Sequence, residues 1–254
     1  MKPFSSFSIE DVKVNRFIIG INSVLGFSHT SKGRDEWIRR YFTTDKITEV
    51  FSSAVNMGIT SLLGPVFPPL HEAINKTEEL TGEKITFIPT TFGKREYFTQ
   101  QIQEIRALGA KFCCLHGGWT DAWKVENGEM VGLENYLKEI REAGLIPGAA
   151  SHNSEHLRIM MEQNYDLAFF VTPVNKSGFY MNPTQELALR VVSESSKPII
   201  AIKPLASGRF DENMISDWFD WAYNRKGVSA ICVGLMSPEE AQEDIEIARN
   251  ILRS

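Results

Sequence analysis

The sequence has few cysteines, no long apolar run and no excess of positive charge. Its 254 residues include three cysteines, which fit neither a disulfide framework nor a paired CxxC zinc site. No run reaches ~18 apolar residues and no secretory leader pattern opens the chain, so we expect neither a membrane span nor export. A net charge of −5 disfavours binding to nucleic acid or anionic lipid. We therefore expect a cytoplasmic protein that binds a small molecule, while its oligomeric state stays open.

What the sequence does contain is eight apolar runs that alternate with helical patterns. The runs lie at residues 17–21, 59–63, 85–88, 111–115, 145–150, 167–172, 198–202 and 228–233. Their lack of strict polar–apolar alternation is typical of parallel strands that are buried on both faces. Apolar residues spaced near 3.6 follow each run, at 47–54, 70–77, 102–108, 133–140, 157–161, 187–191, 215–222 and 241–251.

Eight strand–helix units in this length predict an α/β fold, a single (β/α)8 TIM barrel spanning residues 1–254 as one domain. This architecture is favoured over a doubly wound sheet. Local signals agree with the helix ends. Glycines stand where the helical periodicity stops, at positions 58, 82, 109 and 144. Ser237 and Glu240 predict a capping box, and Asn182-Pro183 predicts an N-cap with a first-turn proline.

All five histidines follow the ends of predicted strands, on the face of a TIM barrel that carries the active site. They are His29, His71, His116, His152 and His156. His116 and His152 end neighbouring strands, so they would lie side by side as a proton-transfer pair or as two ligands of a divalent metal. The third ligand would be one of His71, Glu72, Asp121 and Glu155, a choice that no HExxH or HxH motif decides. The alternative is that one or two histidines are catalytic and the others are loop residues.

Other residues at these strand ends suit an oxygenated ligand. Lys203, in Ile-Lys-Pro-Leu, would polarise a ligand oxygen, a role that we favour over a Schiff-base nucleophile. Asn22, Asn153 and Asn175 are candidate substrate contacts. Aromatic side chains would wall an apolar pocket or pack a lid, and they are Phe92, Trp119, Trp123, Phe179 and Tyr180. The basic loop from His29 to Arg40 would attract an anionic substrate or be solvated.

Several segments share the order of one family's motifs. They are residues 13–17 ahead of Gly20, Gly58-Ile59, Leu115-His116-Gly117, Ser151 to Glu155, Ile202 to Gly208 and Val233 to Glu240. Together they resemble the aldo-keto reductase superfamily, in particular the bacterial and archaeal branch whose seventh strand reads MKPLxGG. The resemblance implies an (α/β)8 barrel with a short N-terminal hairpin before strand 1. It also implies a nicotinamide cofactor, NAD(P), with Ser151, Gly234 and Ser237 on the cofactor side.

The redox residues of that family, an Asp, a Tyr, a Lys and a His, are retained only at His116. Leu63 to Pro69 replaces the segment with the Asp and the Tyr, and Thr90-Thr91 replaces Thr-Lys. Each missing proton donor typically costs about 10²–10⁴ in rate, so ordinary carbonyl reduction is not expected. The acidic residues between Gly234 and Glu240 also give no basis for a preference for NADPH.

Three functional hypotheses follow. The first is an enzyme that acts on a small sugar-like or carboxylated metabolite by acid/base or metal-assisted lyase, isomerase or hydrolase chemistry, with His116 and His152 as acid/base groups or ligands. The second is a divergent NAD(P)H-dependent reductase in which residues 151–153 hold the nicotinamide amide and His116 is the electrophile. The third is an inactive barrel that binds a ligand. Barrels host many chemistries, so the fold does not choose between them.

Overall fold

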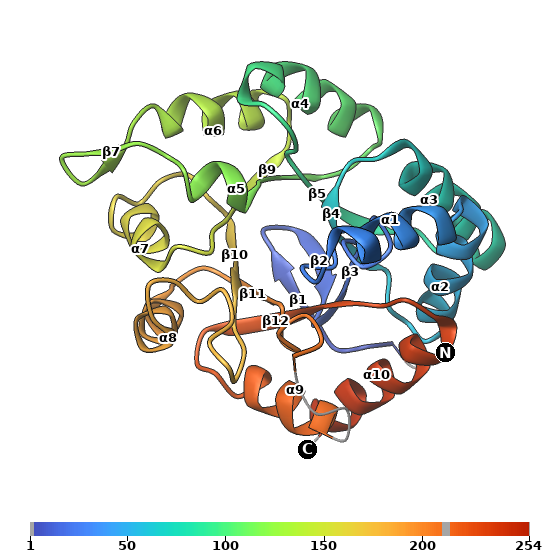
Figure 1. Cartoon of the computed structure of the whole chain (residues 1–254). Helices are drawn as coiled ribbons and strands as arrows, with labels where there is room; N and C mark the ends of the chain where they lie inside the picture. Colours follow the sequence, from blue (N-terminus) through green and yellow to red (C-terminus); the bar gives the residue numbers. More distant parts are fainter. Residues whose placement is uncertain (1–2, 210–213, 254) are drawn as a thin grey trace.

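The computed structural model describes residues 3–209 and 214–253, and eight parallel strands within them close into a barrel surrounded by helices (Figure 1). In order around the barrel, the strands are β3 (Phe17–Gly20), β4 (Ser61–Pro65), β5 (Thr86–Thr90), β6 (Phe112–Leu115), β9 (Ile146–Ala150), β10 (Phe169–Pro173), β11 (Ile199–Ile202) and β12 (Val228–Gly234). β12 pairs with β3 and closes the ring. The eight predicted strands and the (β/α)8 fold are therefore confirmed.

A helix follows each barrel strand at the predicted place. These helices are α2 (Thr44–Asn56), α3 (Pro68–Thr81), α4 (Phe98–Ala107), α6 (Leu133–Glu142), α7 (Ser154–Glu162), α8 (Gln185–Glu194), α9 (Ile215–Tyr223) and α10 (Pro238–Ile251). The four glycines predicted at helix ends all have left-handed backbones, with φ from 70° to 90°. Ser237 caps α10 by accepting the N–H of Glu240, while the carboxylate of Glu240 accepts the N–H of Met236 at 2.7 Å.

Two local predictions are wrong. The basic stretch predicted as a loop forms the helix α1 (Lys32–Tyr41), which is capped by Ser31 and buries only Ile38. Arg39 and Arg40 lie in its last turn, where positive charge complements the helix dipole. Asn182 does not cap α8, because that helix begins at Gln185 and its N-cap is Thr184, whose side chain accepts the N–H of Leu187.

Short elements that no periodicity predicted fill two of the loops. The helical turn η1 (Arg95–Tyr97) precedes α4, and the helix α5 (Gly117–Thr120) follows β6 directly. The strands β7 (Val125–Glu126) and β8 (Glu129–Met130) form a small hairpin before α6. α5 is the element that matters for the site, because it begins at the histidine that ends strand β6.

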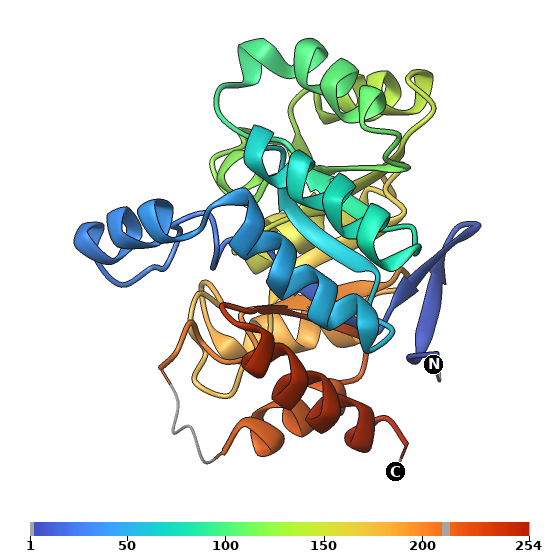
Figure 2. The same ribbon diagram turned by 90° about the vertical axis from the view of Figure 1, so that its right-hand side faces the viewer.

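The predicted N-terminal hairpin is also present, as β1 (Ser6–Ile9) and β2 (Val12–Asn15). Ile9 and Val14 are buried with the interior side chains of the barrel, among them Ile18. Figure 2 shows the hairpin at one end of the barrel and α1 at the other. The hairpin thus covers the amino-terminal end of the strands, and the carboxyl-terminal end is the one left for a site. No helix in the described ranges is long and apolar enough to cross a membrane.

The barrel interior is filled by large side chains that require a glycine opposite them. Phe112 and Phe169 lie edge to face with their ring centres 5.6 Å apart, and both are fully buried. A Cβ atom built on Gly148 of β9 would lie 2.2 Å from Cζ of Phe169. The ring of Phe169 therefore occupies the volume that any larger residue at position 148 would need.

We predict that Gly148→Ala lowers the free energy of unfolding by about 2–3 kcal/mol, because the new methyl group overpacks the interior. Gly33→Ala is the control, since a Cβ atom there meets nothing within 4 Å. It lies in α1 and should be neutral or stabilising by up to about 1 kcal/mol. Urea unfolding followed by circular dichroism measures both variants, and equal midpoints would contradict the prediction.

Candidate active site

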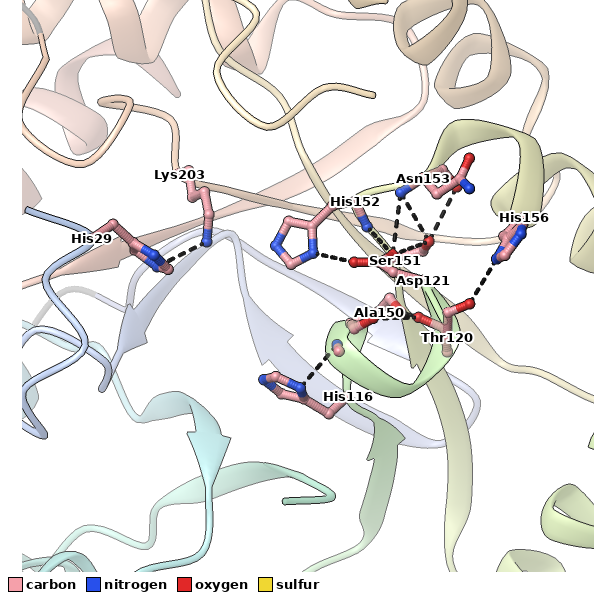
Figure 3. Close-up of polar contacts among 12 residues, drawn as sticks. His29, His116, Thr120, Asp121, Ala150, Ser151, His152, Asn153, His156 and Lys203 are labelled. Atoms are coloured by element: carbon pink, nitrogen blue, oxygen red, sulfur yellow. Dashed lines mark hydrogen bonds and ion pairs between the residues drawn. The ribbon is translucent and has the colours of Figure 1, made fainter. Parts of the chain in front are cut away.

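The carboxyl-terminal ends of three barrel strands bring together the residues predicted to be catalytic. His116 follows β6, His152 follows β9 and Lys203 follows β11. His29, from the loop after β3, joins them (Figure 3). Tyr180, from the loop after β10, packs against two of these side chains. The centre of its ring lies 5.2 Å from the ring centre of His152 and 5.5 Å from the ring centre of His29. The cluster is a polar site at the open end of the barrel.

Asp121 and His152 form a carboxylate–imidazole pair. Oδ2 of Asp121 lies 2.8 Å from Nδ1 of His152, and Oδ1 accepts hydrogen bonds from the backbone N–H groups of His152 and Asn153 and from the hydroxyl of Ser151. Burial raises the pKa of Asp121, but the bonds from His152 and Ser151 outweigh it and hold this pKa below its usual range. An ionised Asp121 places the proton of His152 on Nδ1.

In the neutral ring, the lone pair of His152 is therefore on the other nitrogen, Nε2. Nε2 is buried and has no hydrogen-bond partner among the described residues. It lies on the side of the ring away from Asp121 and faces the space between Lys203 and His116 (Figure 3). A buried acceptor without a partner is uncommon and costs stability, which points to a partner supplied by a ligand. The sequence suggested Asp121 only as one of four possible third metal ligands. Nothing in the spacing of the residues indicated that Asp121 pairs with His152.

His116 has the opposite tautomer. Its Nδ1 accepts the N–H of Gly118 at 3.0 Å, so the proton is on Nε2, and its backbone N–H donates to Thr91. Burial lowers the pKa of His116, and the nearby His152 and Lys203 lower it further. At neutral pH His116 is thus an uncharged hydrogen-bond donor. Its ring contacts an aromatic wall formed by Phe27, Phe67 and Phe92.

Lys203 and His29 share a hydrogen bond. Nζ of Lys203 lies 3.3 Å from Nε2 of His29 and 5.2 Å from the centre of the Tyr180 ring. Burial lowers the pKa of Lys203 to about 8, and burial together with the charge of Lys203 lowers the pKa of His29 to about 4. At pH 7 a protonated Lys203 therefore donates to a neutral His29. The lysine has a left-handed backbone, with φ of 55°, which is uncommon outside glycine.

Two residues that were predicted to contact the substrate have structural roles, and substrate contact by them stays a prediction. Trp119 is 6% exposed, packs on Phe98 and donates its ring N–H to Gly93, so it belongs to the core. Asn175 is fully buried, and its side chain exchanges hydrogen bonds with the backbone of Phe179. Asn175 thereby shapes the loop that carries Tyr180. These side chains could not be placed from sequence, because their partners come from loop conformation.

Asn153 and Asn22 lie nearer the rim of the site. The side chain of Asn153 caps α7 by accepting the N–H of Glu155 at 3.0 Å. Asn22 is half-buried after β3, and its backbone carbonyl accepts the N–H of Phe27. Substrate contact by either side chain stays a prediction.

The predicted metal site is not formed. Within residues 3–209 and 214–253, no three histidine, cysteine or acidic side chains lie in an arrangement that could hold a metal ion. His71 is on α3 and does not join His116 and His152 in such a group. In this structure Asp121 is the partner of His152, and metal binding by His116, His152 and His71 stays a prediction.

The groups expected to bind NAD(P) do not fit a dinucleotide. The hydroxyl of Ser151 donates to Asp121, and that of Ser237 accepts the N–H of Glu240. Gly234 packs against Ser23, whose Cβ would lie 3.0 Å from an added methyl group. A phosphate at the start of α10 would need helix N–H groups. At the start of α10 a phosphate would meet the carboxylate of Glu240, which already accepts the N–H of Met236.

Known proteins match this chain in structure only. No protein-family model matches the sequence, and a search of curated proteins found no match. A candidate aldo-keto reductase from Pseudomonas aeruginosa has a TM-score of 0.71 and 14% identity, over 99% of this chain and 98% of that one. An aldo-keto reductase from Brucella melitensis has a TM-score of 0.64 and 11% identity, with coverage of 97% and 93%.

A barrel of another class is also similar. A truncated 3-deoxy-D-arabino-heptulosonate 7-phosphate synthase from Thermotoga maritima has a TM-score of 0.59 and 12% identity, with coverage of 99% and 92%. The resemblance to aldo-keto reductases that the sequence motifs indicated is therefore confirmed at the level of the fold. At these identities the likeness carries no reaction or substrate.

We predict that Lys203→Met raises the free energy of unfolding at pH 7 by about 1–3 kcal/mol, because the folded protein holds the ammonium less readily than the unfolded chain does. The lowered pKa makes wild-type stability rise between about pH 8 and pH 10.5, where only the unfolded chain is protonated. The gain should therefore shrink when urea unfolding is repeated at pH 9.5. Lys138→Met, at an exposed position on α6, is the control. Destabilisation by Lys203→Met at pH 7 would contradict the prediction.

We also predict that NADPH does not bind in the micromolar range, because the start of α10 presents carboxylates where phosphates would lie. The measurement is quenching of tryptophan fluorescence during titration with NADH and NADPH. A saturable change at micromolar cofactor would show that the phosphates find other donors, and it would restore the reductase hypothesis.

Proposed function

We propose that this protein is an enzyme that moves a proton next to the carbonyl group of a small oxygenated metabolite, as an isomerase or a lyase. The observation that carries the proposal is the free, buried Nε2 of His152, whose opposite nitrogen is bound to an ionised Asp121. This arrangement is that of a general base: the carboxylate fixes the tautomer and stabilises the imidazolium that forms.

Two other groups of the site, His116 and Lys203, can stabilise the negative charge that this proton transfer creates. When the C–H proton moves to His152, the electron pair of that bond passes into the carbonyl group and negative charge develops on its oxygen. The neutral N–H of His116 and the ammonium of Lys203 are donors able to stabilise that oxygen. In an isomerisation of a hydroxy-carbonyl compound, the proton returns to the former carbonyl carbon and the hydroxyl proton moves to the other oxygen. In an elimination, the electron pair of the enolate expels a leaving group from the carbon β to the carbonyl.

Several features favour this function over carbonyl reduction. Phe67 stands in the segment where the aldo-keto reductases have their proton-donating tyrosine, and Ser151 and Ser237 are engaged within the protein. The aromatic wall of Phe27, Phe67 and Phe92 beside His116 suits a small substrate with an apolar edge. We further propose a cytoplasmic location, because Cys113, Cys114 and Cys232 are all buried and unpaired.

The test is proton exchange in deuterated water with dihydroxyacetone, glycolaldehyde, pyruvate and hydroxypyruvate, followed by the loss of the proton NMR signal beside the carbonyl. We expect His152→Asn to slow exchange by about 10²–10⁴, because the base is removed. Asp121→Asn should slow it by a similar factor, since the wrong tautomer is then held. His156→Asn is the control, because that ring bonds to the carbonyl of Thr120 outside the cluster.

Two results would overturn the proposal. Equal exchange rates in the wild type and in His152→Asn would show that this histidine is not the base. Saturable binding of a compound in the panel, with no exchange on any of them, would favour the hypothesis of an inactive ligand-binding barrel.

A further inference from the structure

The side of the site formed by the loops after β3 and β11 has two cations that form no ion pair within the part of the chain that the structure describes. Lys203 bonds to His29, as described above, and Arg209 donates to the backbone carbonyls of His29 at 2.8 Å and Ala206 at 3.3 Å. The guanidinium of Arg209 lies 4.2 Å from the centre of the Phe179 ring. None of the ion pairs among the described residues involves Lys203 or Arg209.

Among the described residues, the carboxylates whose charge acts on this group are Asp121 and Asp35, and both are hydrogen-bonded elsewhere. Asp121 is held by His152 and Ser151, and Asp35 accepts from the backbone N–H and the hydroxyl of Ser28 at 2.8 and 2.6 Å. Other cations of the chain, such as Arg141 and Arg158, have two carboxylate partners each. Among the described residues Lys203 therefore forms no direct ion pair with a carboxylate, although Asp121 lies near enough for its charge to raise the pKa of Lys203.

A half-buried ammonium is unfavourable unless an anion accompanies it. Lys203 donates one N–H to His29 and has two more to offer. Because Nε2 of His29 accepts that bond, its Nδ1 carries a proton and is a further donor. Arg209 fixes this geometry by tying the loop of His29 to the turn after Lys203. Lys203, His29 and Arg209 together therefore provide hydrogen-bond donors and positive charge, and none of the three side chains has a free hydrogen-bond acceptor.

The backbone around Lys203 favours a carboxylate over a phosphate. In the turn after it, the N–H of Ala206 donates to the carbonyl of Lys203 and the N–H of Gly208 donates to that of Leu205. These two N–H groups are therefore engaged within the turn and are not free to bind a phosphate. Two or three side-chain donors match the two oxygens of a carboxylate.

The group also lies next to the proposed base. The ring of Tyr180 contacts all three relevant side chains, with Lys203, His29 and His152 each within 5.5 Å of its centre. We propose that Lys203, His29 and Arg209 form a carboxylate subsite beside His152, which makes the substrate a small 2-oxo or 2-hydroxy acid. This inference rests on the proposed function, because His152 decides which end of the acid reacts.

The test is a ligand-observed NMR titration with glycolate, with its uncharged analogue glycolamide, and with inorganic phosphate. We expect glycolate to bind at least tenfold more tightly than glycolamide. Lys203→Met should weaken glycolate at least tenfold and Arg209→Gln three- to tenfold. Lys32→Met removes the same charge from the exposed first turn of α1 and should change affinity less than twofold.

Three results would overturn the subsite: equal affinity for glycolamide, glycolate binding unchanged in Lys203→Met, or phosphate bound tenfold more tightly than glycolate. His152→Asn separates this inference from the function. If exchange is lost in His152→Asn while Lys203→Met still binds glycolate normally, the base stands and the subsite fails. If exchange persists in His152→Asn while Lys203→Met loses glycolate, the subsite stands and the base fails.

Discussion

The pairing of β12 with β3 is the constraint on which the rest of this structure depends. It closes the sheet, so eight strand ends that are far apart in the sequence meet at one rim. The seam is tight: a Cβ atom on Gly20 would lie 3.0 Å from Sγ of Cys232. Because the N-terminal hairpin covers the opposite end, the rim where His116, His152 and Lys203 lie is the end left open for the proposed site.

Charge at that rim is organised around one anion. Asp121 is ionised and bound to His152, and near it the pKa values of His116 and Lys203 are lowered. His116 therefore stays neutral, and because its Nδ1 accepts the N–H of Gly118, its proton is on Nε2. Asp121 thus holds the proton of His152 on Nδ1, whereas Gly118 sets the donor role of His116, and Lys203 is the nearby cation.

The fold resembles that of solved aldo-keto reductases, and of the redox residues that the sequence resemblance implies only His116 is present. Leu63 in β4 and Phe67 after it are apolar, and Asp121 follows the short helix α5. The shape of the barrel thus does not depend on those redox residues. This is the general behaviour of a fold whose loops carry the function and whose strands carry the stability.

Much of the fold and part of the site follow from the sequence alone. Apolar runs and helical spacing identify eight strands and their helices, because a strand that is buried on both faces has a nearly continuous run of apolar residues. Once the barrel is known, the histidines must lie at one end. The helix α1 was missed because only Ile38 is buried, so its apolar face leaves almost no pattern.

Only the tertiary structure decided what those residues touch. The bond between Asp121 and His152 joins positions 31 residues apart, and that between His29 and Lys203 joins positions 174 apart. Trp119 is likewise buried in the core, and Asn175 bonds to the backbone of its own loop. The periodic burial of side chains can be recognised from short segments of sequence. The partner of a polar group depends instead on loop geometry, which no local pattern encodes.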